Sequence, residues 1–103
     1  MKKVIDGKVY NTDTADVVCD LSSMENYSSS QWHETLLYRT RNGTFFLAGE
    51  GGAASMWAGH VGHTPTGGAG LRVIDVEEAR RWMESAECDQ EEFEKFGLSV
   101  VEG

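Results

Sequence analysis

The stretch TLLYRTRNGTFFLA, residues 35–48, decides the fold class of this chain. Two runs rich in β-branched and aromatic residues, Thr35–Thr40 and Thr44–Ala48, lie on either side of Asn42-Gly43. The Asn-Gly pair is favoured in hairpin turns in which both central residues have a positive φ. The pattern therefore predicts an antiparallel hairpin at the centre of the chain.

A second hairpin is predicted near the start of the chain, where Lys2–Ile5 and Lys8–Asn11 lie on either side of Asp6-Gly7. Asp-Gly suits the same kind of tight turn. Further along, the apolar run Leu71–Ile74 predicts a single strand. We expect this N-terminal hairpin to bury three apolar side chains, those of Val4, Val9 and Tyr10.

Apolar residues recur at helical spacing in three segments. Thr14–Leu21 begins at a threonine that suits an N-cap and places its apolar residues on one face. Val76–Glu87 follows Asp75, whose carboxylate suits the same role. Asp89–Phe96 buries two phenylalanines, and Gly97 marks its end.

The remaining segments are predicted to be loops that connect these elements. Ser22–Gln31 is serine-rich, and Gly49–Gly70 holds eight of the twelve glycines, so we expect a loop in each, with one or two helical turns in Ala53–Ala58. The order of elements predicts an α+β domain: an antiparallel sheet of about five strands (two hairpins plus one strand) with two to three flanking helices. With 103 residues and no internal repeat, residues 1–103 are expected to form a single domain.

Charge is the strongest global signal. The chain has 17 acidic and 9 basic residues, for a formal net charge of -8. Residues 1–74 carry seven acids and six bases, whereas residues 75–103 carry ten acids and three bases, so the net charges are -1 and -7. Such an acidic region repels nucleic acid and acidic membranes and attracts basic surfaces. The partner we expect is therefore a protein with a basic groove, not nucleic acid.

Sequence motifs give little support to catalysis. His60 and His63, with Glu50 upstream, could share a metal ion, but two loop histidines do not make a site, and we expect them to be exposed. Cys19 and Cys88 are too distant for a Cys-x-x-Cys pair, and we expect small core or surface residues rather than a disulfide. No nucleophile elbow or phosphate-binding motif is present. We predict no catalytic residue, metal, cofactor or small-molecule substrate.

The sequence has no apolar run long enough to span a membrane. Its first ten residues, MKKVIDGKVY, lack the apolar region of a signal peptide. We therefore expect a cytoplasmic protein with no membrane partner.

The acidic region admits two interpretations. Glutamates on helices often form only a solvated face that keeps a protein soluble. Alternatively, carboxylates on two helices are spaced like backbone phosphates and compete for a lysine- and arginine-lined groove. On that second interpretation, the candidate partner-binding residues are Glu84, Glu87, Asp89, Glu91, Glu92 and Glu94.

Three stretches carry a resemblance to a known family: KKVIDGKVYNTDTA (residues 2–15), LLYRTRNGTFFLAGEGG (residues 36–52) and VEEARRWMES (residues 76–85). Across most of residues 1–87 the chain resembles small proteins of bacterial phages and mobile elements, and in particular anti-CRISPR inhibitors of type I CRISPR surveillance complexes. The resemblance implies an antiparallel sheet flanked by helices and a negative surface that occupies the DNA-binding channel of the complex. None of the three stretches is a catalytic signature.

The expected function is therefore inhibition of a type I CRISPR effector by acidic mimicry of DNA, in the cytoplasm of a bacterial host cell. One alternative is an antitoxin-like protein that neutralises another basic protein. A further alternative is a small metal-dependent enzyme that uses His60 and His63.

Overall fold

The computed structural model of the chain describes residues 1–23, 26 and 28–103. The central sheet is antiparallel, in the order β3–β4–β5–β8, with β3 Asp16–Asp20, β4 His33–Arg39, β5 Phe45–Gly51 and β8 Gly68–Ile74. Two further hairpins join β1 (Lys2–Ile5) to β2 (Lys8–Asn11) and β6 (Gly59–Val61) to β7 (Thr64–Thr66). Two helices complete the fold, α1 (Val76–Ser85) and α2 (Gln90–Lys95).

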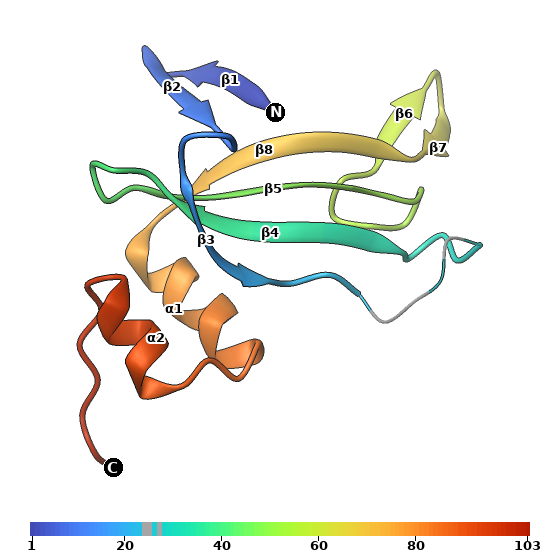
Figure 1. Ribbon diagram of the computed structural model, residues 1–103. Helices are drawn as coiled ribbons and strands as arrows, with labels where there is room; N and C mark the ends of the chain where they lie inside the picture. Colours follow the sequence, from blue (N-terminus) through green and yellow to red (C-terminus); the bar gives the residue numbers. More distant parts are fainter. Residues whose placement is uncertain (24–25, 27) are drawn as a thin grey trace.

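The described residues thus form an α+β structure with antiparallel sheets and two helices, which is the predicted class. The β-structure is more extensive than predicted, with eight strands in three sheets rather than about five strands in one. Figure 1 shows α1 and α2 against one face of the central sheet and the β1–β2 hairpin over the opposite face. The β6–β7 hairpin projects near the far end of the sheet. None of the described helices has the length and apolar character needed to cross a membrane.

Alternation along the central strands divides the core between the two faces of the sheet. Leu37 and Leu47 point towards the helices and pack with Met83 of α1 and Phe93 of α2. On the opposite face, Phe46 stacks on Tyr38 with ring centroids 5.0 Å apart and meets Tyr10 of β2 edge-on at 5.6 Å. Tyr10 is therefore the side chain that anchors the β1–β2 hairpin on the sheet.

Both predicted hairpins are confirmed, but their turns differ. At the β1–β2 turn both central residues have positive φ, Asp6 at 52° and Gly7 at 76°. At the β4–β5 turn only Gly43 does, at 90°, because the loop has three residues closed by bonds from Thr40 N to Thr44 O and from Gly43 N to Thr40 O. A three-residue loop needs a left-handed conformation only at its last position.

The predicted helix over Thr14–Leu21 is wrong, since residues 16–20 form strand β3 at the edge of the central sheet. Pairing with β4 gives these β-branched residues ladder hydrogen bonds on one side, which outweighs a short helix of residues with low helix propensity. Val18 is buried and Val17 is 52% exposed, as alternation on a half-covered strand requires. A bulge between Val17 and Cys19 shifts the register.

Two burial predictions also need correction. Val4 and Val9 were expected in the core, but they are 65% and 55% exposed. They are direct cross-strand partners, so they share one face of the hairpin, while Tyr10 lies on the other face and is buried. A two-stranded ribbon that covers the sheet can bury only one of its faces.

The glycine-rich segment 49–70 is mostly ordered β-structure rather than a loop. Residues 53–58 form turns instead of a helix. They place Trp57 on the helix side of the sheet, where its Nε1 donates to Thr35 Oγ1 at 2.7 Å. Glycine is needed here because a Cβ at Gly49 would lie 2.8 Å from Trp57 Nε1, and one at Gly70 would lie 3.1 Å from the ring. The predicted loop 22–31 is confirmed only in its described part, since residues 24, 25 and 27 lie outside the described residues.

The two C-terminal helices are confirmed, with shorter bounds than predicted. Asp75 caps α1 by accepting from Glu78 N at 2.8 Å, and the helix ends at Ser85 rather than near Glu87. Asp89 caps α2, and Gly97 follows its end with a φ of 79°. The apolar side of both helices faces the sheet, so their polar side is directed to solvent.

Candidate functional site

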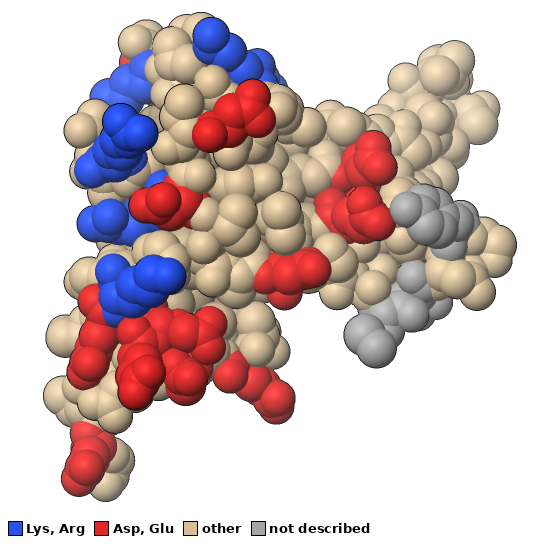
Figure 2. All heavy atoms as spheres, in the orientation of Figure 1, with Lys and Arg blue, Asp and Glu red and all other residues tan. Residues whose placement is uncertain are grey.

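The six predicted partner-binding residues lie together on the helical layer, and we call them the acidic helical face. Glu84 lies on α1, Glu87 in the connection, Asp89 at the N-cap of α2, and the other three on α2. Figure 2 shows acidic side chains gathered over these helices. Glu92 is partly buried, and the other five are exposed. The set comprises Glu84, Glu87, Asp89, Glu91, Glu92 and Glu94.

Half of this face has a local structural task. Asp89 accepts from Glu92 N at 2.9 Å, and Glu92 Oε1 accepts from Asp89 N at 3.4 Å, so the two form a capping box. Glu94 Oε1 accepts from the side chain of Gln90 at 3.0 Å. Within the described part of the chain, Glu84, Glu87 and Glu91 make no such bonds. These three carboxylates are therefore the ones that the fold leaves available.

Most basic side chains gather elsewhere. In Figure 2 most lysines and arginines lie over the β1–β2 hairpin and the neighbouring end of the sheet, and one basic side chain borders the acidic cluster. Lys2, Lys3 and Lys8 are on the hairpin, and Arg41 is in the β4–β5 turn; all four are exposed. Three basic residues, Arg80, Arg81 and Lys95, lie on the helices, where acidic residues outnumber them.

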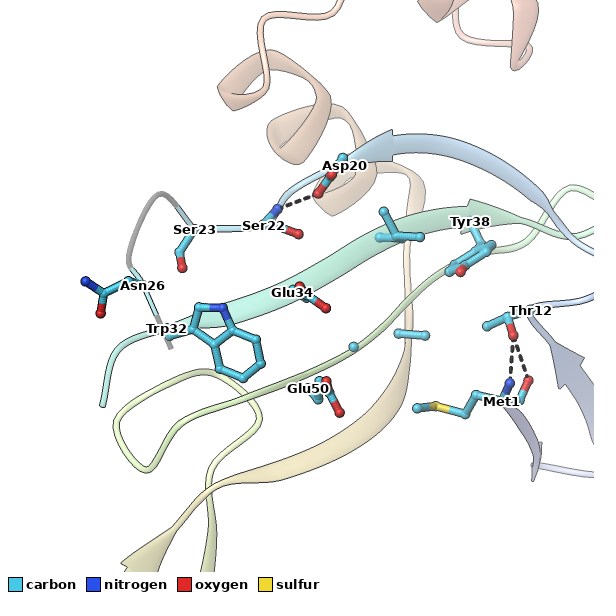
Figure 3. A pocket seen from close by; sticks show the side chains of 13 residues that line it. Met1, Thr12, Asp20, Ser22, Ser23, Asn26, Trp32, Glu34, Tyr38 and Glu50 are labelled. Carbon is cyan, nitrogen blue, oxygen red and sulfur yellow. Dashed lines mark hydrogen bonds between the residues drawn. The ribbon is translucent and has the colours of Figure 1, made fainter. Parts of the chain in front are cut away.

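A second candidate site is a hollow of about 670 Å³ on the sheet face opposite the helices (Figure 3). The sequence did not predict it. The β1–β2 hairpin lies at one end, Asn26 and Trp32 lie at the other, and strands β4 and β5 form the floor. We call this the sheet-face hollow and define it by its floor of Leu36, Tyr38 and Ala48, the indole of Trp32, and three carboxylates, Asp20, Glu34 and Glu50.

Part of this site could have been inferred from the central hairpin. Glu34 and Glu50 are direct partners in the β4–β5 register, so the position of the turn alone places them side by side. Asp20 could not be placed in this way, because β3 was predicted as a helix. It pairs with Leu36, accepts from Ser22 N at 2.8 Å, and has its pKa lowered by hydrogen bonds from Ser22.

The histidines do not assemble into a metal site. His60 lies on β6 and His63 in the β6–β7 turn, and both are exposed. Among residues 1–23, 26 and 28–103, no group of three His, Cys, Asp or Glu side chains could hold a metal ion. Glu50, which the sequence placed upstream of them, belongs instead to the sheet-face hollow.

The two cysteines are neighbours in space, which their separation in sequence concealed. Both are free and partly buried against the core between sheet and helices, and the Cys88 sulfur is near enough to affect the pKa of Cys19. Burial, the neighbouring sulfur and nearby carboxylates raise the pKa of Cys19 to about 12. Burial also raises the pKa of Cys88, although the Cys19 thiol opposes this effect.

The molecule therefore offers two acidic surfaces on opposite sides of one sheet, one on the helices and one concave. Both are built from carboxylates. Comparison with known protein families, curated proteins and solved structures finds no match to this chain.

Proposed function

We propose that this protein is a non-enzymatic inhibitor that docks its acidic helical face onto the basic, DNA-accepting surface of a partner protein. The observation that carries the proposal is the gathering of exposed carboxylates on one layer of the molecule, where they outnumber the basic side chains. Phe93 and Met83 are buried beneath this face and hold both helices on the sheet. A partner would therefore meet a fixed arrangement of charge rather than a flexible acidic tail.

Fixed carboxylates compete with DNA for a simple physical reason. A groove that accepts DNA presents lysines and arginines to phosphates, and binding gains much of its free energy from those charges. An acidic surface of similar spacing satisfies the same cations and is attracted from a distance. This mode of action requires no catalytic residue, cofactor or metal.

The partner class that we propose is the DNA-binding channel of a type I CRISPR effector complex, met in the cytoplasm of a bacterial host. The resemblance of residues 2–15, 36–52 and 76–85 to anti-CRISPR proteins supports this choice. An antitoxin-like neutraliser of another basic protein would use the same face. The two differ only in the identity of the basic partner.

The test measures binding of the purified protein to a purified type I effector complex, with and without target double-stranded DNA. We expect mutually exclusive binding that weakens steeply as salt is raised, because exposed charges are screened. Simultaneous binding of DNA and protein would contradict mimicry. Failure to bind this complex, with DNA-competitive binding to another basic protein from the same host, would favour the antitoxin-like function.

Two variants with the same change in net charge test whether the acidic helical face itself contacts the partner. E84K/E91K reverses two available carboxylates, whereas D13K/D16K makes the same change in net charge near the β1–β2 hairpin. Because like charges facing each other cost several kcal/mol, the first variant should bind about 100-fold more weakly, and the second should bind normally. Asp89 and Glu92 are avoided because they cap α2. Equal loss in both variants would mean that only net charge matters.

A further inference from the structure

The sheet face opposite the helices is covered over only part of its length. The β1–β2 hairpin packs on Tyr38 and Phe46 through Tyr10, and the sheet-face hollow begins where this contact ends. Its floor continues along the strands through Leu36 and Ala48. The volume of about 670 Å³ is in the range of sites that enclose a small ligand or a long side chain.

The charged side chains among the described residues around this floor are all carboxylates. Glu34 and Glu50 are paired directly across β4 and β5, an arrangement in which like charges repel. Asp20 adds a third carboxylate from β3, beside Leu36 in the register. No lysine or arginine lies among the described residues that line the hollow. The amino group of Met1 is at its edge, where it donates to Thr12 Oγ1 at 2.8 Å.

Figure 3 shows how these groups are arranged. Glu34 and Glu50 project near each other from adjacent strands, Trp32 lies next to them, and Asp20 stands on the side of β3. An apolar floor, an indole and carboxylates at the border together match one kind of side chain. The aliphatic part of an arginine covers an apolar floor, its planar guanidinium stacks on an aromatic ring, and its five N–H groups can reach two carboxylates at once.

We infer that the sheet-face hollow binds an arginine side chain carried by an extended segment of a partner protein. Charge complementarity selects a cation, and the apolar floor selects one with a long aliphatic stem. A metal ion is the poorer occupant, because among the described residues no three His, Cys, Asp or Glu side chains could hold one. This surface lies across the sheet from the acidic helical face, so it does not depend on the proposed function.

The test uses a defined probe, the tripeptide acetyl-Val-Arg-Val-amide, added to the ¹⁵N-labelled protein and followed by NMR. Its control is the same peptide with citrulline, which keeps the shape of arginine but has no charge. We expect the arginine peptide to shift the Trp32 indole and the amides of β4 and β5, and the citrulline peptide to shift none of them. Equal shifts with both peptides, or shifts confined to α1 and α2, would overturn the inference.

Two variants that each remove a single negative charge locate the contact. Glu50→Gln removes one carboxylate of the hollow, and Glu84→Gln removes one from the acidic helical face. Loss of one exposed charge pair should weaken peptide binding about threefold in E50Q and leave E84Q unchanged. The opposite ranking would assign the peptide to the helices. Because effector binding and peptide binding are measured separately, either proposal can fail while the other stands.

Discussion

The two acidic surfaces of the molecule hold their charges in different ways. On the acidic helical face, carboxylates project into solvent from two short helices. In the sheet-face hollow, carboxylates from three strands border an apolar floor and an indole. An exposed charge acts mainly through a field that salt screens, whereas contact with an apolar floor is insensitive to salt. The helices are thus suited to attracting a basic partner, and the hollow to selecting one side chain.

The two surfaces also depend on different parts of the core. The helical face rests on the side chains packed between helices and sheet, among them Phe93, which is 6% exposed. The hollow depends on the register of β4 and β5 and on the β1–β2 hairpin. A substitution in one part of the core can therefore perturb one surface and leave the other intact.

The largest effect is expected at the base of the helical layer. Phe93→Ala removes a buried ring from the contact between α2 and the sheet and should lower the free energy of unfolding by about 3–5 kcal/mol. Urea denaturation monitored by circular dichroism measures this change. Glu91→Gln, two positions earlier and exposed, is the control and should change stability by less than about 0.5 kcal/mol. Similar stability of both variants would mean that α2 does not dock on the sheet.

Gly49 tests how closely β5, the strand that carries Glu50, fits its neighbours. A Cβ there would lie 2.8 Å from Trp57 Nε1 and 2.9 Å from Thr35 Cα, so Gly49→Ala must displace the indole or separate β4 from β5. Such overpacking should cost about 1–3 kcal/mol, and NMR should show the change at Glu34 and Glu50.

Gly59→Ala is the matched control for this prediction. A Cβ at Gly59 meets nothing within 4 Å, and its φ is not in the left-handed region. The same chemical change should therefore be neutral or slightly stabilising there. If both alanine variants were equally stable, the close approach of Trp57 to β5 would be refuted.

On the acidic helical face, variants at Asp89 and Glu91 distinguish the structural role of a carboxylate from the effect of its charge. Asp89→Ala removes the cap of α2 and should cost about 1 kcal/mol, whereas Glu91→Ala removes only an exposed carboxylate and should cost less than about 0.5 kcal/mol. Both changes raise the net charge equally. Binding to a basic partner should fall in both variants, so a stability loss of equal size would show that Asp89 does not cap the helix.

Local chemistry explains which of these features could be read from the sequence. The β4–β5 hairpin was predictable because Asn42-Gly43 fixes a turn between two β-rich runs, and α2 because Asp89 and Gly97 mark its ends. Strand β3 was missed because its five residues become a strand only by pairing with β4, which begins after twelve intervening residues.

The same distinction applies to the sites. The acidic helical face is contiguous in sequence, so its charge was visible in the composition of residues 75–103. The hollow collects carboxylates from three strands, and only the Glu34–Glu50 pair follows from a single turn. The packing of Cys19 and Cys88 against the same core depends on how α1 and α2 dock on β3, which no local pattern encodes.

The last prediction concerns Cys19, on the strand that carries Asp20 and packs against the helical layer. The pKa of Cys19 is about 12 in the folded protein, against an ordinary value of 9.0. In the unfolded chain the thiol ionises from about pH 9, while the folded protein still retains its proton. The stabilisation is therefore complete below pH 9 and is lost as the pH rises from 9 to about 12.

Urea midpoints measured under reducing conditions at about pH 7 and pH 10.5 test this, because tyrosine and lysine ionisation affects wild type and variant alike. Stability of the wild-type protein should fall more between the two pH values than stability of Cys19→Ala. The sign follows from proton binding, since the folded state holds one proton that the unfolded state releases. Parallel pH profiles would show that Cys19 is solvated like an ordinary thiol, and that sheet and helices are less closely joined at β3 than the structure indicates.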